Sequence, residues 1–339
     1  MSKFYNCGCY YSRNIFIKKY NTHFTYHDSQ QFHQEYNKIL PSLGCDTELK
    51  KTLLEQEINK EVDRRKNLES EAFCRKELLQ KLYKPLDPSV YKLQDCYLDP
   101  KFKLLVNSCR NSTKKQISPF LDIISEEKQL YGFPIFAEEF CCLILKELDH
   151  YAESDLPKGK PNSMNKYGVL IDEIGFQENF SNVLRTKYLD PLSALLFPEW
   201  RGERLDSHKI FSVSYKMGQD LDLDYHYDNS EVTLNICLGK SFKGSELYFG
   251  DTKAVPIFDS SCVMVPHKVG YGIFHRGQQL HGALPLISGE RHNLIIWLRS
   301  SSVRNKKCPM CNLKPALLVP SNGYGDGFTD STVQVCNVL

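Results

Sequence analysis

The chain has 339 residues, of which 41% are hydrophobic and 25% are charged, a composition typical of a globular protein that can bury a sizeable core. Its formal net charge of +2 excludes the strongly basic character of a general nucleic-acid-binding surface, so we expect no nucleic-acid partner. No apolar run is long enough to cross a bilayer, and we therefore expect no transmembrane segment.

Thirteen cysteines are scattered along the chain. The N-terminal sequence, MSKFYNC, has no basic start followed by an apolar stretch, so we do not identify a secretory signal. Cysteines in a protein without such a signal are usually reduced thiols. These two features predict a cytoplasmic or nuclear protein.

The first predicted region, residues 1–117, is an accessory region of mixed but largely helical structure. Residues 14–27 alternate apolar and polar side chains, which predicts one or two short strands. Residues 46–83 predict a long charged helix, and its thin apolar stripe comprises Leu54, Ile58, Val62, Leu68 and Phe73. The helix could bind a partner or pack on the neighbouring domain, and the sequence leaves both interpretations open.

The second predicted region, residues 118–303, begins with helices and continues with strands. Apolar residues recur at helical spacing in 136–151 and 183–196, and the polar stretch between them, residues 154–167, predicts a loop that could act as a lid. From residue 209 short strands rich in β-branched and aromatic residues follow: KIFSVSYKM, EVTLNICL, ELYFG, SCVMVP, YGIFH and HNLIIWL. This order predicts an α+β protein with a β-sandwich or barrel flanked by helices.

The third predicted region, residues 304–339, contains a Cys-x-x-Cys segment and a Gly-, Ser- and Asp-rich tail that we expect to be mobile. Cys308 and Cys311 have the spacing of a zinc site but supply only two of its four ligands. Cys7 and Cys9 would complete the set if the chain ends meet. Free or redox-active thiols are the alternative.

The last four residues, Cys336-Asn-Val-Leu339, fit the C-a-a-X prenylation pattern. No polybasic run precedes them, and a single lipid binds membranes weakly. The sequence thus indicates at most a weak prenyl anchor at Cys336.

The most informative motif is His226-Tyr227-Asp228, which is followed 53 residues later by His281. Residues i and i+2 of a strand project to the same face, so His226 and Asp228 can contact one ion, while His281 reaches it from another strand. Two histidines and one carboxylate are the ligand set of a non-haem Fe(II) centre, which leaves three positions open for a co-substrate and O₂.

Arg291 lies ten residues after His281, beyond the turn signal at Ser288-Gly289. A returning strand would bring its guanidinium near the metal. There it could pair with the distal carboxylate of a 2-oxo diacid, because a buried carboxylate requires a counter-charge and arginine offers two donors in the same plane. Of the histidines close by in sequence, we do not expect His267, His275 or His292 to be ligands.

These motifs resemble a known family. HYDNSEVTLNICL (residues 226–238) resembles the His-x-Asp-x-Ser-x-x-Thr-x-Asn-x-x-Leu run of the procollagen lysyl and prolyl hydroxylase group of 2-oxoglutarate/Fe(II) dioxygenases. HGALPLISGER (residues 281–291) and YKMG (residues 215–218) are similar to two further segments of that group. Over the whole chain, CGCYYSRNIFIKKY, PNSMNKYGVLIDEIGF and CPMC resemble the 2-oxoglutarate and iron-dependent oxygenase domain-containing protein 2 group.

The resemblance implies a double-stranded β-helix (jelly roll) and an oxygenase that uses Fe(II), 2-oxoglutarate and ascorbate. By the same resemblance, His226, Asp228 and His281 are the iron ligands and catalytic residues, and Arg291 anchors 2-oxoglutarate, with Tyr215 and Asn235 as further co-substrate contacts. It also implies hydroxylation of a prolyl or lysyl residue of a protein substrate. Two alternatives stay open: oxidation of a small molecule or lipid, and a catalytically silent binding protein on the same fold.

Overall fold

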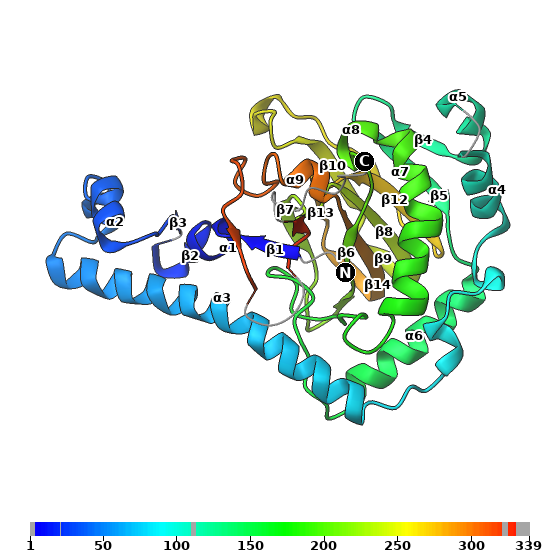
Figure 1. The fold of residues 1–339 in the computed structure, drawn as a ribbon, viewed down its shortest axis with the longest axis horizontal. Helices are drawn as coiled ribbons and strands as arrows, with labels where there is room; N and C mark the ends of the chain where they lie inside the picture. The colour runs from blue at the N-terminus through cyan, green and yellow to red at the C-terminus, as the bar shows by residue number, and fades with distance from the viewer. Residues whose placement is uncertain (1–3, 21, 110–112, 321–324, 330–339) are drawn as a thin grey trace, which may run out of the picture. The chain divides into compact units, whose positions relative to one another are not determined.

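A computed structural model describes residues 4–20, 22–109, 113–320 and 325–329 of the chain (Figure 1). The chain divides into two compact units. We call residues 75–304 the core unit, and residues 1–74 together with 305–339 the terminal unit. The predicted prenylation motif at Cys336 lies outside the described residues.

The core unit contains two antiparallel sheets. The order of the larger sheet is β4 (Asp122–Ser125), β5 (Leu130–Pro134), β12 (Tyr271–Arg276), β8 (Val232–Gly239), β14 (Leu286–Arg299) and β6 (Ser207–Lys216), with β9 (Phe242–Gly244) paired to β14. The order of the smaller sheet is β11 (Val263–Val265), β10 (Leu247–Thr252), β13 (Gln279–Ala283) and β7 (Leu223–His226). From β6 to β14 the chain passes repeatedly between the two sheets, which confirms the predicted double-stranded β-helix.

Strand β8 shows how the sequence serves both faces of the larger sheet. All eight of its residues are buried. Its alternate apolar side chains, among them Leu234 and Ile236, belong to the main hydrophobic core together with Ile144 of helix α6 (Glu138–Glu153). Thr233 and Asn235 project from the opposite face and line a pocket. The strand therefore carries polar residues at two buried positions because one of its faces forms a site rather than a core.

Helices of the core unit pack around the larger sheet. They are α4 (Pro100–Cys109), α5 (Lys114–Ile117), α6, α7 (Asp190–Leu196), α8 (Pro198–Arg201) and α9 (Ser301–Arg304). Two segments of π-helical turns, Gln177–Ser181 and Leu184–Leu189, precede α7, and short 3-10 turns cover Pro88–Tyr91, Asp95–Tyr97, Ser118–Phe120 and Ile257–Asp259. The boundary that we expected after residue 117 lies inside this unit, because α4 buries Phe102, Leu105 and Val106 in the same core as the strands.

The terminal unit combines both ends of the chain. One sheet has the order β15 (Leu317–Leu318), β1 (Phe4–Cys7) and β16 (Phe328–Thr329), and a hairpin pairs β2 (Ile15–Ile17) with β3 (Thr22–Phe24). Helices α1 (Cys9–Ser12) and α2 (Ser29–Tyr36) belong to this unit, which also includes a 3-10 turn at Lys18–Tyr20 and another at Pro41–Leu43. The described part of the tail, which we expected to be mobile, differs from that expectation: two of its segments form strands by pairing their backbones with β1, a pairing that a Gly- and Ser-rich sequence does not signal.

The predicted long helix is α3 (Glu48–Leu82), which begins in the terminal unit. The first part of its apolar stripe is buried: Leu54 and Ile58 pack in a separate core with Ile15, Phe24 and Phe32. Phe73, further along the stripe, is 39% exposed. The N-terminal hairpin and α2 thus occupy the stripe only over its first turns.

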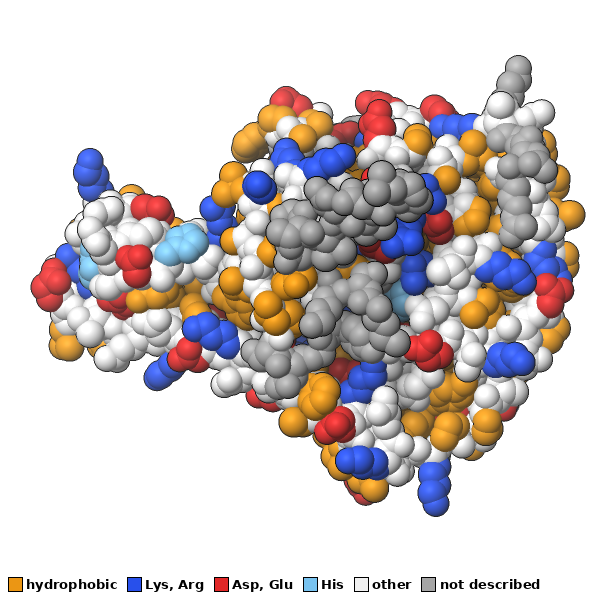
Figure 2. Space-filling model, viewed as in Figure 1, with side chains coloured by type: hydrophobic (Ala, Val, Ile, Leu, Met, Phe, Trp, Pro, Cys, Tyr) orange, Lys and Arg blue, Asp and Glu red, His pale blue; other side chains and the backbone are white. Residues whose placement is uncertain are grey.

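Side chains of both charges are interspersed on the face shown in Figure 2, as the small net charge predicts. Among the described residues, no helix is both long and apolar enough to cross a membrane.

Candidate active site

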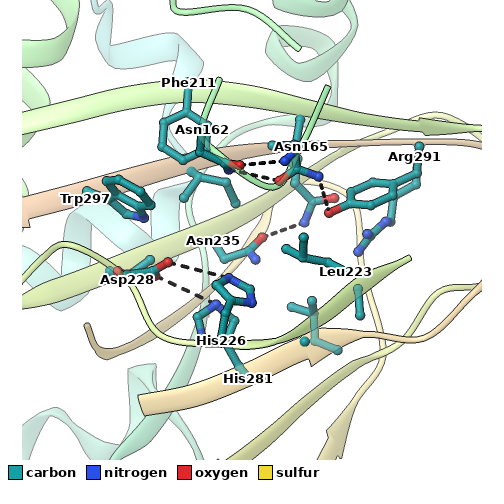
Figure 3. A pocket seen from close by; sticks show the side chains of 18 residues that line it. Asn162, Asn165, Phe211, Leu223, His226, Asp228, Asn235, His281, Arg291 and Trp297 are labelled. Carbon is teal, nitrogen blue, oxygen red and sulfur yellow. Dashed lines mark hydrogen bonds and ion pairs between the residues drawn. The ribbon is translucent and has the colours of Figure 1, made fainter. Parts of the chain in front are cut away.

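A pocket lies between the two sheets of the core unit and gathers the predicted site residues (Figure 3). His226, Asp228, His281, Arg291, Tyr215 and Asn235 all line it. They come from five strands and one loop, and the sheet register places them together. His226 lies directly opposite His281 on β7 and β13, and Tyr215 lies opposite Arg291 on β6 and β14.

The three predicted metal ligands converge on one point. One ligand atom of each of His226, Asp228 and His281 lies within 4.8 Å of the others. Each Nε2 atom is 3.8 Å from an oxygen of the Asp228 carboxylate, and the centroids of the two imidazole rings are 4.3 Å apart. Two imidazoles and one carboxylate at this spacing fit a single divalent ion.

Backbone carbonyls fix the orientation of both imidazoles. Nδ1 of His226 lies 2.7 Å from the carbonyl oxygen of Asp224, and Nδ1 of His281 lies 2.9 Å from that of Gln279. A nitrogen that faces a carbonyl must carry the proton, so each Nε2 keeps a free lone pair toward the centre. Burial and the neighbouring His281 ring lower the pKa of His226 to about 4, which keeps this imidazole neutral at neutral pH.

Asp228 follows β7 on a loop that is held on both sides. Its backbone N–H donates to Gly277 at 2.8 Å, and the side-chain amide of Gln278 donates to its carbonyl at 3.0 Å. The hydroxyl of Thr233 donates to Oδ2 of the carboxylate at 2.7 Å. A Cβ atom at Gly277 would lie 2.0 Å from the carbonyl oxygen of Ser230, so only glycine allows the two loops this close approach.

Arg291 lies at the other end of the pocket and is only 1% exposed. Its guanidinium carbon is 4.0 Å from the centre of the Tyr215 ring, and Nη1 is 2.5 Å from Nε2 of His267. Asn165 donates to the Tyr215 hydroxyl at 3.0 Å, which fixes the ring beneath the guanidinium. Within the described parts of the chain, Arg291 forms no ion pair with a carboxylate, although a buried charge normally requires one.

Several buried polar atoms around the pocket have no hydrogen-bond partner among the described residues. They are Nε of Arg291, Oδ1 of Asn293 and Nε1 of Trp297, and all three residues line the pocket. Unsatisfied buried groups are rare in folded proteins and indicate a missing partner. A polar, anionic ligand between Arg291 and the triad would supply one, so the residues fit a diacid such as 2-oxoglutarate.

The remaining predicted site residues have clear positions. Asn235 accepts a hydrogen bond of 2.5 Å from the side chain of Asn293. His275 is fully buried with its ring 4.8 Å from that of His281, but it does not belong to the cluster of ligand atoms, and burial lowers its pKa to about 3. His292 points away and contacts Ser214 at 2.9 Å.

Sequence reasoning missed three residues that shape this site. Thr233 orients the carboxylate, Asn165 orients Tyr215, and His267 contacts Arg291. The sequence does offer a signal for Thr233, because a polar residue within an otherwise apolar strand indicates that this strand contributes to a site. The sequence offers no such signal for Asn165, because the loop that carries this residue meets β6 only in the folded structure. The C-terminal end of the loop that we predicted as a lid is hydrogen-bonded to β6, where the carbonyl of Tyr167 accepts from the backbone N–H of Ser214 at 3.1 Å.

Comparison with known proteins identifies the family. The model of the OGFOD2-like domain matches residues 79–202. Proteins named 2-oxoglutarate and iron-dependent oxygenase domain-containing protein 2 from Xenopus tropicalis and Homo sapiens are each 45% identical to this chain, and each alignment covers 98% of this chain and 97% of the relative. The chain belongs to this family. It is therefore a 2-oxoglutarate and iron-dependent oxygenase, which makes it an oxidoreductase.

More distant similarities extend beyond the family. The human multifunctional procollagen lysine hydroxylase and glycosyltransferase LH3 is 26% identical over 49% of this chain and 23% of its own length. A solved prolyl 4-hydroxylase structure from Phytophthora capsici is 17% identical, covers 62% of this chain and 68% of its own, and superposes with a TM-score of 0.42.

Proposed function

We propose that this oxygenase hydroxylates a prolyl or lysyl residue of a protein substrate, with His226, Asp228 and His281 as iron ligands and Arg291 as the anchor of 2-oxoglutarate. The observation that supports it most directly is the buried Arg291, which faces the same pocket as the triad and has no carboxylate partner among the described residues. A catalytically silent binding protein would have no physical need to retain an uncompensated buried cation beside an intact ligand set.

When both are bound, iron and 2-oxoglutarate supply the oxidising chemistry, in which O₂ converts 2-oxoglutarate to succinate and CO₂ and the second oxygen atom enters a C–H bond of the substrate. The protein's own groups position the reactants. The two imidazoles and the carboxylate of Asp228 would hold the metal through three ligand atoms, a set that would leave positions free for the co-substrate and O₂. Arg291, whose guanidinium stacks on the Tyr215 ring, binds the far carboxylate of the co-substrate.

Asn235 and Asn293 extend from adjacent strands between the triad and Arg291, and we propose that they contact the co-substrate along its length. Neither the side-chain carbonyl oxygen of Asn293 nor the indole N–H of Trp297 has a hydrogen-bond partner in the described part of the chain. The walls around these groups are apolar, including Phe211, Val213 and Leu223, so they exclude water from the reacting centre.

Formation of succinate from 2-oxoglutarate without added substrate tests the site assignment. We expect Asp228→Ala to remove bound iron and succinate formation, since it deletes the only carboxylate ligand. His292→Gln is the matched control, because His292 lies outside the pocket and its loss should change neither. If the wild-type protein binds iron but forms no succinate, or if Asp228→Ala retains both iron and turnover, the assignment is wrong.

The substrate class requires a separate experiment. Incubation of a cell extract with wild-type protein, against Asp228→Ala, should produce peptides that are heavier by one oxygen atom at prolyl or lysyl residues. Modified small molecules or lipids without modified peptides would support the alternative substrate class instead.

We also propose that ascorbate supports turnover by keeping the iron reduced. Its omission should lower the number of turnovers before inactivation without changing the initial rate, and an unchanged total yield would contradict this. A reducing compartment, cytoplasmic or nuclear, is proposed because the described cysteines are all free and several of them are buried.

A further inference from the structure

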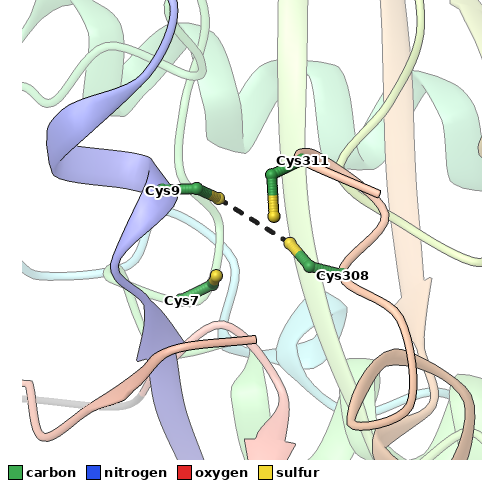
Figure 4. Close-up of side chains that lie close together, drawn as sticks. All are labelled: Cys7, Cys9, Cys308 and Cys311. Atoms are coloured by element: carbon green, nitrogen blue, oxygen red, sulfur yellow. Dashed lines mark hydrogen bonds between the residues drawn. The ribbon is translucent and has the colours of Figure 1, made fainter. Parts of the chain in front are cut away.

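The terminal unit contains a second cluster of side chains that can bind metal. Cys7 ends strand β1, Cys9 begins α1, and Cys308 and Cys311 lie on a turn nearly 300 residues away in sequence (Figure 4). The four sulfur atoms all lie within 4.8 Å of one another, and those of Cys9 and Cys308 are 3.7 Å apart. The cluster is separate from the iron site in ligand type and in structural unit.

The sulfur spacing matches a single tetrahedral ion. At a zinc–sulfur distance of about 2.3 Å, the corners of a tetrahedron lie about 3.8 Å apart. A disulfide would bring two sulfurs to about 2.0 Å, far closer than the 3.7 Å between Cys9 and Cys308. An iron–sulfur cluster contains several metal ions with bridging sulfides, and it requires a wider cavity than one between sulfurs at this separation.

The backbone around both cysteine pairs is arranged to hold them in place. The N–H of Gly8, between Cys7 and Cys9, donates to Ala316 at 2.7 Å and joins the N-terminal pair to the C-terminal segment. The turn that carries the second pair closes when Asn312 donates to the carbonyl of Cys308 at 2.9 Å, and Asn312 adopts a left-handed conformation with φ of 61°. Asparagine is one of the few residues that adopts this conformation at low cost.

The part of the terminal unit around the cluster has little apolar packing of its own. Among the described residues, its core comprises three buried side chains, those of Cys7, Cys308 and Phe328, with partly buried side chains packed around them, and it is distinct from the core that the N-terminal hairpin and α2 form with α3. A core this small stabilises a fold weakly, and small units of this kind commonly depend on a metal. In addition, Cys308 is fully buried, so reactants in solvent cannot reach its thiol.

We propose that Cys7, Cys9, Cys308 and Cys311 bind one zinc ion that joins the two ends of the chain. Four thiolates close the coordination sphere, so the ion has a structural role and no open position for chemistry. Thiolate ligands in a tetrahedron select zinc over the harder divalent ions, whereas the imidazole and carboxylate set of the core unit suits Fe(II). The four thiols release protons as the ion binds.

Metal analysis of the full-length protein tests the proposal. We expect one zinc per chain in the wild type, and none in the Cys308→Ser/Cys311→Ser double variant. The matched control is Cys74→Ser/Cys262→Ser, which replaces two exposed cysteines outside the cluster and should retain the zinc. Asp228→Ala should retain it as well, which separates this zinc from any ion bound at the His-Asp-His site.

X-ray absorption on the wild-type protein keeps the proposal testable if the double variant fails to fold. Zinc with four sulfur neighbours at about 2.3 Å is the expected result. Nitrogen or oxygen neighbours, iron in place of zinc, disulfides among the four cysteines, or a well-folded wild type without zinc would each overturn the proposal. None of these outcomes bears on the oxygenase assignment, which has its own ligands and assay.

Discussion

Replacement of Arg291 by methionine tests the link between the buried cation and co-substrate binding. Arg291 and Arg304 form a natural pair for comparison, since they are 1% and 0% exposed respectively. Arg304 has a buried carboxylate partner, with Nε 3.0 Å from Glu231, whereas Arg291 contacts the Tyr215 ring and His267 and has no carboxylate partner among the residues that the structure describes. The two substitutions remove the same charge from equally buried positions but should have opposite consequences.

The magnitudes follow from the partners. Arg304→Met removes the ion-pair partner of the buried Glu231 carboxylate, on which Arg299 acts more weakly, and this should lower the free energy of unfolding by about 3–5 kcal/mol. Arg291→Met removes a desolvation penalty of several kcal/mol and a cation–π contact of about 2 kcal/mol, so the ligand-free protein should be as stable as the wild type or more stable. The same change should weaken 2-oxoglutarate binding by about 2–5 kcal/mol, roughly 30-fold to several thousand-fold.

Thermal unfolding and calorimetric titration with 2-oxoglutarate would measure both effects, with Mn(II) as a metal that does not turn over. At about 100 times its dissociation constant, 2-oxoglutarate should stabilise the wild type by about 2.7 kcal/mol and should stabilise Arg291→Met at the same concentration by far less. If Arg291→Met lost as much stability as Arg304→Met, or bound 2-oxoglutarate normally, the reasoning from the unpaired cation would be refuted.

Two further substitutions test how the metal ligands are positioned. Thr233→Val removes the donor to the Asp228 carboxylate at nearly constant volume and should weaken iron binding about 10- to 100-fold, while Thr186→Val at an exposed helical position should leave it unchanged, as metal titration would show. Gly277→Ala places a methyl group 2.0 Å from the Ser230 carbonyl and should lower both iron affinity and the melting temperature. Normal iron affinity in either Thr233→Val or Gly277→Ala would show that the replaced residue is not needed to position Asp228.

The sequence predicted the strands of the core unit well because each carries a local signal. The segments KIFSVSYKM, EVTLNICL and HNLIIWL correspond to β6, β8 and β14, which are neighbours in the larger sheet and carry the β-branched and aromatic residues typical of strands. Strands β7 and β13 were less visible, since they are short and consist partly of the site residues themselves. A strand built around polar ligands lacks the apolar pattern by which strands are recognised.

The sequence alone determined which residues serve as candidate metal ligands and co-substrate anchor, and how far apart they lie along the chain. His226 and Asp228 are two residues apart because a strand and its exit loop present both to one ion, and that constraint is local. The tertiary structure decided which other side chains contact these residues. The loop of Asn165 lies under Tyr215, and Cys7 lies beside Cys308, only because segments distant along the chain meet after folding. A linear pattern records which groups are available, but hydrogen bonds and metal ligands form between neighbours in space.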